Sequence, residues 1–194
     1  PRIKSGAVNS DLSLMSHPKF VEGARCLQEA GLSLDFWIYH TQLSEMEKIA
    51  MTLPELSIIL NHIGGPIHLG EYEGKQALTH REWRKAMMRL SRLPNIKVKL
   101  GGLGMKVNGA KFHLNHNPPN SSQLADIWKS WIYETIDMFG VERCMFESNF
   151  PVDKGSCSYG SLWNAFKIIS ENMSDNEKNK LFYENAAKTY KIKL

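Results

Sequence analysis

The sequence predicts an α/β domain in which parallel strands alternate with helices. Short apolar runs and amphipathic segments follow one another with few residues between them, which is the order of strand–helix units in a parallel sheet. The run 58–60 is Ile-Ile-Leu, apolar at consecutive positions, as expected of a strand covered on both faces. Polar residues directly follow several apolar runs, and this position favours a barrel, because barrel chemistry gathers at the carboxyl ends of strands.

The helices are expected from apolar spacing and from their end signals. Gly31 is a natural C-cap for the first helix, and Ser44 with Glu47, then Thr79 with Glu82, have the spacing of capping boxes that open the next two. The expected helices run over 18–30, from 44 to the proline at 54, over 79–93, 122–139 and 159–173, and through a tail opened by Ser174.

Apolar runs between these helices predict the strands. They lie at 32–39, 56–61, 96–100 and 143–147, and a further strand is expected near 2–8. We expect the four internal strands to be mutually parallel in this spatial order, with helices on one face only.

Two architectures fit such an order, an open doubly wound sheet and a closed barrel. The open sheet usually carries a glycine-rich phosphate turn, and the only candidate, 101–104, lacks both the G-x-G-x-x-G spacing and an immediate helix. We therefore predict a (β/α)8 TIM barrel that is incomplete in this chain. A whole barrel takes about 250 residues, so we expect 1–194 to be the C-terminal part of one barrel domain, about its last five βα units, with the N-terminal units absent.

Composition limits the classes of function. The 194 residues are 42% hydrophobic and 23% charged, the mix of an ordinary globular domain. Because the net charge is only +4 and basic residues are interspersed with acidic ones, we expect no nucleic-acid partner. No apolar run is long enough for a membrane span, and three scattered cysteines suit neither a disulfide framework nor a zinc ribbon. We expect a cytoplasmic protein with a small-molecule substrate and no membrane partner, and a homo-oligomer stays open.

Polar residues at the predicted strand ends are the candidate site. His40 follows the first strand, His62 the second, Gly101-Gly102 the third, and Ser148-Asn149 the fourth. A single histidine is more often structural than functional. His62 is favoured because a sharp glycine turn follows it, where loops carry function.

Alternation along the strands adds two charged candidates. Lys99 lies on the face opposite the apolar residues of its strand, so it is expected to point into the barrel mouth and meet a substrate anion; a solvated edge strand is the alternative. Glu147 shares a face with Asn149 and would need a partner, for which Lys99 is the expected choice. A purely structural Glu–Lys pair fits equally well.

Five motifs in register resemble the amidohydrolase-related family of metal-dependent hydrolases and lactonases, which includes fuconolactonase-like and pyrone-dicarboxylate-hydrolase-like members. They cover nearly the whole chain. They are LQEAGLSLD at 27–35, IILNHIGGP at 58–66, LPNIKVKLGGL at 93–103, FGVERCMFESNFPVD at 139–153 and NAAKTY at 185–190.

The resemblance implies an eight-stranded barrel with its site at the carboxyl mouth, and often a bound metal. Matched by motif, His62 is the sixth-strand histidine, and His40 lies near the fifth-strand one. Asn149 stands where the family has the eighth-strand aspartate, and Glu147 stands where a glycine is common. A neutral amide is a poor metal ligand and no general base. A divalent metal such as zinc is therefore implied by the resemblance but not supported by Asn149, and the metal stays unknown.

These residues predict a hydrolase of a small, carboxylate-bearing cyclic ester or amide. The expected catalytic residues are His62, which would polarise the carbonyl, Asn149, and either Glu147 or Asp153 as base; Lys99 and His40 would bind substrate. Two alternatives stay open: a non-oxidative decarboxylase of the same superfamily, and a truncated or inactive barrel that acts as a binding or scaffold module.

Overall fold

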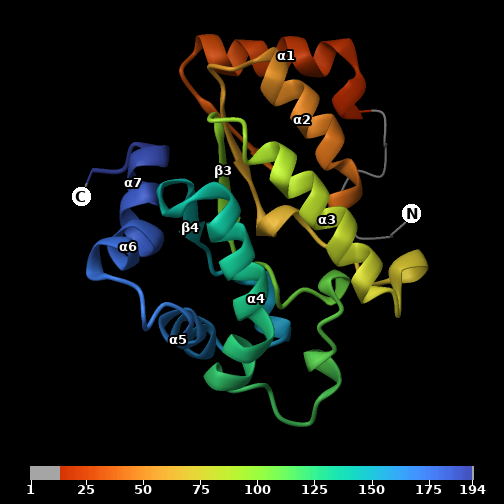
Figure 1. The fold of residues 1–194 in the computed structure, drawn as a ribbon, viewed down its shortest axis with the longest axis vertical. Coiled ribbons are helices and arrows are strands. Elements are labelled where there is room, and N and C mark those ends of the chain that lie inside the picture. The colour runs from red at the N-terminus through yellow and green to blue at the C-terminus, as the bar shows by residue number, and fades with distance from the viewer. Residues whose placement is uncertain (1–13, 194) are drawn as a thin grey trace.

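A four-stranded parallel sheet forms the centre of the molecule in the computed structural model, which describes residues 14–193 (Figure 1). The spatial order is the chain order, which confirms the predicted topology. Each pair of neighbours is parallel and is joined through a helix, as βαβ units require. The strands are β1 (Ser33–Phe36), β2 (Ser57–Leu60), β3 (Ile96–Leu100) and β4 (Cys144–Phe146).

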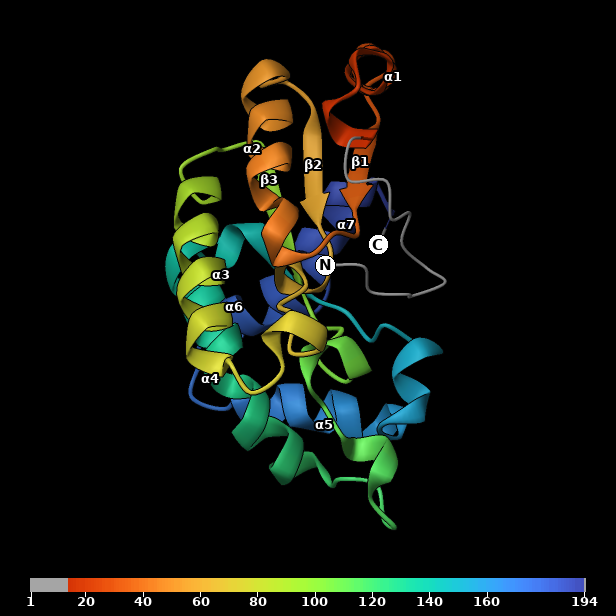
Figure 2. The ribbon, with the colours of Figure 1, turned by 90° about the vertical axis from the view of Figure 1, so that its right-hand side faces the viewer.

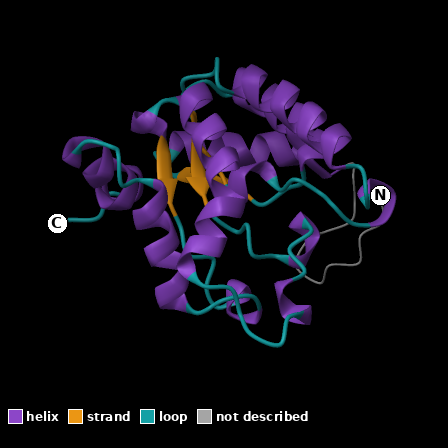
Figure 3. Ribbon diagram, turned by 60° about the horizontal axis from the view of Figure 1, so that its bottom comes forward, coloured by secondary structure: helices purple, strands orange, loops and turns teal. Residues whose placement is uncertain are grey.

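Helices connect the strands and follow the last one. The expected strand near 2–8 lies outside the described residues. The helices are α1 (Pro18–Glu29), α2 (Leu43–Thr52), α3 (Gln76–Leu90), α4 (Ser121–Phe139), α5 (Tyr159–Ile169), α6 (Asp175–Asn179) and α7 (Asn185–Tyr190), with a π-helical segment Lys180–Glu184 between the last two. The strands are short beside the helices that surround them (Figure 3).

One face of the sheet forms the core with α1 to α5. Alternate strand residues are fully or almost fully buried there, among them Phe36, Leu60, Val98 and Phe146. The helices supply matching apolar side chains, and α2, α3 and α4 lie together on one side of the strands in Figure 2. Burying this apolar surface is the main favourable contribution to folding.

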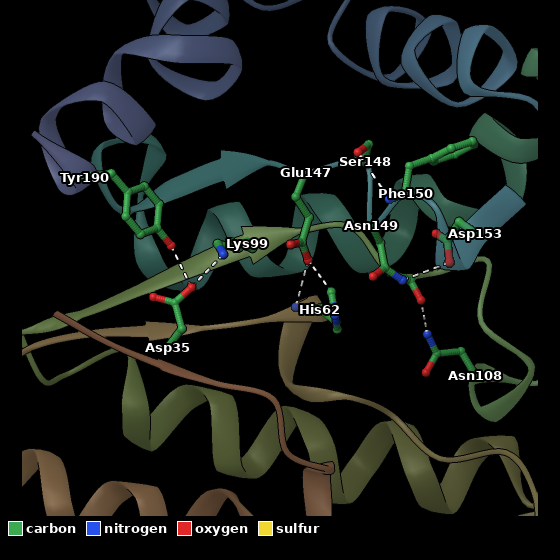
Figure 4. A network of polar contacts seen from close by, with 11 residues as sticks. Asp35, His62, Lys99, Asn108, Glu147, Ser148, Asn149, Phe150, Asp153 and Tyr190 are labelled. Carbon is green, nitrogen blue, oxygen red and sulfur yellow. Dashed lines mark hydrogen bonds and ion pairs between the residues drawn. The ribbon is translucent and has the colours of Figure 1, made fainter. Parts of the chain in front are cut away.

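The opposite face carries charged residues near its middle. Lys99 Nζ lies 2.7 Å from Asp35 Oδ2, and the hydroxyl of Tyr190, at the end of α7, donates to the same oxygen at 2.7 Å. The three residues form one group in Figure 4. The expectation of helices on one face therefore holds for α1 to α5, whereas α7 reaches the other face through Tyr190.

Two of the expected helix starts are wrong. Helix α2 begins at Leu43, before Ser44, and Gln42 precedes it without a side-chain cap. Helix α3 begins at Gln76, so Thr79 lies inside it, where the buried hydroxyl donates to the Ile67 carbonyl at 2.8 Å. The spacing of a capping box is present in both places, but each helix begins earlier in the chain, at an N-cap residue, Gln42 or Lys75, that makes no side-chain cap hydrogen bond.

Other end signals are confirmed. Gly31 adopts φ +64° just after α1, and Ser174 caps α6 in a reciprocal box with Glu177. None of the helices within residues 14–193 has the length and apolar character that crossing a bilayer needs.

Two side chains fasten the amino end of β4 to its neighbours. The guanidinium of Arg143 donates to the carbonyls of Phe139, Leu93 and Ser91 at 2.7–2.9 Å. The amide of Asn185, the first residue of α7, donates to the carbonyls of Val141 and Cys144, both at 2.7 Å. Backbone carbonyls of helix ends, of the turn before β3 and of the first residue of β4 are thus satisfied by side chains.

We predict that Asn185→Ala lowers the free energy of unfolding by roughly 2–3 kcal/mol, because it leaves two inward carbonyls without donors. Asn176→Ala is the matched control, since Asn176 is exposed on α6. Urea unfolding followed by circular dichroism measures both. Equal stability of the two variants would show that Asn185 does not hold β4 in place.

Candidate active site

The candidate residues follow the carboxyl ends of three neighbouring strands. His62 comes two residues after β2, Gly101 and Gly102 come directly after β3, and Glu147 comes directly after β4. Since carboxyl ends of parallel strands meet at one edge, these residues are brought together there. Figure 4 shows His62 and Glu147 side by side, apart from the Asp35–Lys99–Tyr190 group.

The closest polar contact joins His62 to Glu147. Glu147 Oε1 accepts a hydrogen bond from the backbone N–H of His62 at 3.0 Å and also bonds to the ring nitrogen Nδ1. The two side chains are only 12% and 15% exposed. Because an ionised carboxylate can only accept, the contact places a proton on Nδ1, and in the neutral ring the lone pair is then on Nε2. The sequence predicted Lys99 as the partner of Glu147, and this pairing is wrong.

The backbone around this pair is unusual. His62 and Asn149 have φ of +54° and +52°, in the left-handed region that L-residues rarely adopt. Such conformations cost about 1–3 kcal/mol and persist where the surroundings require them. Here the sharp turns after β2 and β4 direct both side chains across the strand ends.

Glycine lets β3 approach the pair closely. A Cβ on Gly102, whose φ is +67°, would lie 2.6 Å from Cγ of His62, and a Cβ on Gly101 would lie 2.4 Å from Cγ of Glu147. Both positions therefore require glycine for packing, and Gly102 requires it for its conformation as well. The place of these glycines at the strand end is predicted from the sequence, but their close packing against His62 and Glu147 is not.

Asn149 and Asp153 form a second contact beside the first. Asn149 Nδ2 donates to Asp153 Oδ1 at 2.9 Å, and Asp153 is 1% exposed. Burial raises the pKa of Asp153 to about 6, although hydrogen bonds from Asn149 and the Gly104 backbone oppose the shift. Its other oxygen, Oδ2, is buried without a hydrogen-bond partner in the described part of the chain.

Lys99 does not join these residues. Its ammonium is held by Asp35 and lies 5.2 Å from the centre of the Tyr190 ring. Burial works against the charged form, but the bonds to Asp35 and Tyr190 outweigh it and raise the pKa of Lys99. The expected convergence of Lys99 with His62 and Asn149 is therefore not observed.

His40 also lies in a different environment. Its buried ring accepts from the Ile67 N–H at 3.2 Å, meets the Tyr72 ring edge-on with centroids 4.9 Å apart, and lies 3.7 Å from Glu82. Burial lowers the pKa of His40. These contacts hold the segment that follows Gly65, whereas none of the described contacts joins His40 to His62.

Trp37 is a site neighbour that sequence reasoning missed. Its ring packs edge-on against His62, with centroids 4.5 Å apart, from the residue just after β1. A Cβ on Gly65 would lie 3.0 Å from the same ring. The position of Trp37 at the end of an expected strand was the available signal.

The donor groups of the site are those that a metal would need or lack. Zinc sites in enzymes use three protein ligands drawn from His, Cys, Asp and Glu. Among the side chains that the structure describes within residues 14–193, no three of these residue types form a group that could hold an ion. Nδ1 of His62 is occupied by Glu147, and Asn149 offers an amide. The described residues alone thus do not fit a metal.

Known sequences resemble this chain over nearly its whole length. A family model described as amidohydrolase matches residues 9–192. The protein y4mH of Sinorhizobium fredii is 38% identical over 179 residues, which is 90% of this chain and 52% of that protein. An L-fucono-1,5-lactonase of Burkholderia multivorans is 25% identical over 174 residues, 89% of this chain and 56% of the lactonase. The chain thus spans about half the length of the curated relatives it matches.

Solved structures share the fold. A crystal structure of an amidohydrolase from Burkholderia multivorans with bound zinc superposes with a TM-score of 0.80 at 23% identity, over 94% of this chain and 61% of that one. A putative 2-pyrone-4,6-dicarboxylic acid hydrolase from Pseudomonas putida gives 0.66 at 16% identity, over 97% and 61%. The likeness confirms the predicted fold class, an incomplete (β/α)8 barrel.

We predict that Gly102→Ala displaces His62 and destabilises the protein by roughly 2–3 kcal/mol, through the clash and the positive φ together. Gly155→Ala is the control, because nothing lies within 4 Å of the added Cβ. Denaturant unfolding and the imidazole NMR signals of His62 are the measurements. Unchanged His62 signals in Gly102→Ala would contradict the close packing described above.

A second prediction concerns pH. The folded protein holds the proton of Asp153 more tightly than the unfolded chain, whose ordinary pKa is 3.8. The free energy of unfolding therefore falls as pH rises from about 4 to about 6, by roughly 3 kcal/mol, and stays lower above that range. Asp153→Asn removes this contribution. The free energy of unfolding of Asp153→Asn, minus that of the wild type, should therefore increase by about 3 kcal/mol between pH 4 and pH 7. A difference that does not change with pH would contradict the raised pKa.

Proposed function

The chain belongs to the amidohydrolase family, and on that premise we propose that it supplies active-site residues to a hydrolase of small, carboxylate-bearing cyclic esters or amides. The observation that carries the proposal is the His62–Glu147 pair at the carboxyl ends of β2 and β4. A relative named as an L-fucono-1,5-lactonase and a fold neighbour named as a putative 2-pyrone-4,6-dicarboxylic acid hydrolase support the substrate class.

In the proposed reaction the imidazole of His62 activates water. Glu147 holds the Nδ1–H, so Nε2 takes a proton from water while the water oxygen bonds to the substrate carbonyl carbon. The proton then passes to the leaving oxygen or nitrogen as its bond to that carbon breaks. The product is an open-chain hydroxy acid or amino acid. This differs from the sequence-based hypothesis, in which His62 polarises the carbonyl, because the contact with Glu147 favours the base.

Asn149 and Asp153 are proposed to assist. The bond from Nδ2 to Asp153 orients Asn149 and leaves its Oδ1 as an acceptor for a substrate hydroxyl or amide. Asp153, with a pKa of about 6, exchanges its proton near neutral pH and is the second candidate for the base. Lys99 and His40 reach a substrate only if their present bonds open, so we propose that they support the scaffold instead.

The same residues were also compatible with decarboxylation or with an inactive binding module. A histidine oriented by a carboxylate is the arrangement that activates a nucleophile such as water, and decarboxylation has no water to activate. The His62–Glu147 contact thus favours hydrolysis over both.

We predict that His62→Ala lowers kcat on an active lactone by a factor of about 100 or more, the scale of losing one key catalytic contact. Glu147→Gln keeps the shape but leaves the ring poorly oriented, so it should lower kcat while KM changes little. Proton release from L-fucono-1,5-lactone and 2-pyrone-4,6-dicarboxylate measures turnover.

The control for these variants is His116→Ala, since His116 is exposed in the loop before α4. It should leave kcat unchanged. Turnover of His62→Ala at the wild-type level would return His62 to a structural role. Release of carbon dioxide without ring opening would favour the decarboxylase instead.

A further inference from the structure

A cavity of about 320 Å³ lies between helix α4 and the loop that follows β3. Its walls are aromatic, from Phe112, Trp128, Trp131 and His68, with Asn108 and Lys111 adding polar groups. Neither His62 nor Glu147 lines it. The loop concerned is the green segment that runs below α4 in Figure 1.

The walls are held by contacts independent of any ligand. Trp131 packs edge-on against His68 with centroids 6.0 Å apart and against Trp83 at 4.7 Å. The backbone N–H of His68 donates to the Val107 carbonyl at 2.8 Å. Gly109 comes so close that a Cβ there would lie 2.8 Å from Cβ of His68. The cavity is thus largely preformed, as small-molecule sites usually are.

Polar atoms of three lining residues are buried with no hydrogen-bond partner within the described residues. They are Nδ1 of His68, Oδ1 of Asn108 and Nε1 of Trp128. An unpaired buried polar atom costs about 1–3 kcal/mol. All three residues line the same cavity, but these atoms have almost no accessible surface in the present arrangement, so a bound molecule supplies the missing partners when the side chains turn towards it.

The charge of the lining is positive. Lys111 contributes an ammonium, and no Asp or Glu is among the lining residues. Lys111 forms an ion pair with Glu73 at 3.7 Å, in which the two side chains are 68% and 64% exposed. Exposed ion pairs contribute little to stability, so Glu73 holds Lys111 only weakly. Burial lowers the pKa of His68, so its ring is present as a neutral donor and acceptor.

We propose that this cavity is a binding site for a small aromatic carboxylate. The ring lies among Phe112, Trp128 and Trp131, where edge-to-face and stacked contacts add to the burial of apolar surface. The carboxylate points to Lys111, and Asn108 and His68 hold the remaining polar groups. The volume is near the lower end for small-molecule sites, which suits one or two rings. The site does not depend on hydrolysis by His62.

The test is calorimetric titration of the wild type with 2-naphthoate at low salt, with 2-naphthalenemethanol as the neutral analogue. One binding site is expected. Ala110→Trp fills the cavity and should abolish binding, and Phe112→Ala should weaken it while leaving the fold unchanged by circular dichroism. Lys111→Met should weaken binding roughly two- to fivefold, as loss of an exposed ion pair does.

The matched control is Lys106→Met, an exposed lysine of the same loop that does not line the cavity. It should bind as the wild type does. The site is overturned if the wild type does not bind 2-naphthoate. It is also overturned if Ala110→Trp and Phe112→Ala both bind 2-naphthoate as tightly as the wild type does. Equal affinity for 2-naphthalenemethanol overturns its preference for carboxylates.

A second arm separates this cavity from the hydrolytic site. His62→Ala should keep full affinity for 2-naphthoate, whatever it does to turnover. Loss of binding in that variant would place the ligand beside His62 and overturn the separate site.

Discussion

The parallel register of β2, β3 and β4 is the constraint on which the candidate site depends. Leu60 is level with Val98, and Leu100 is level with Phe146, so the residues that follow arrive at one height. Glu147 therefore lies against Gly101, and His62 against Gly102. A slip of one residue would move every side chain of a strand to the other face. The apolar residues of these strands prevent such a slip, because one face must stay in the core.

Local pattern was enough to predict the strands, their order and most of the helices, because apolar periodicity reports which face is buried. The pattern was less informative about the level of a residue along its strand relative to the residues of the neighbouring strands. Alternation put Lys99 and Glu147 on one face correctly, yet Lys99 is level with Met145, below Glu147, and Asp35 holds it from two strands away. Pairing between strands is a tertiary property, and a single strand does not encode it. For the same reason, His62 was placed at its strand end while its contact with Glu147 was not foreseen.

The neighbours of position 149 explain why an asparagine, and not an aspartate, is found there. Burial is the main cause that raises the pKa of Asp153, and the nearby charge of Glu147 adds to it. A third carboxylate at position 149 would add repulsion in a half-buried setting, where unpaired charges are costly. The amide instead donates to Asp153. The neutral residue is thus compatible with a carboxylate at 147, the position where the resemblance led us to expect glycine.

The contact of Tyr190 with Asp35 joins residues 155 positions apart. Contacts of such separation form slowly, because a long loop must close before they stabilise anything. During synthesis, the first strand described here leaves the ribosome long before the tyrosine that covers its charged face. The ion pair between Asp35 and Lys99 can form once β3 exists, but it stays open to water until α7 has been made. Folding of this face is therefore completed from the carboxyl end, after translation has passed residue 190.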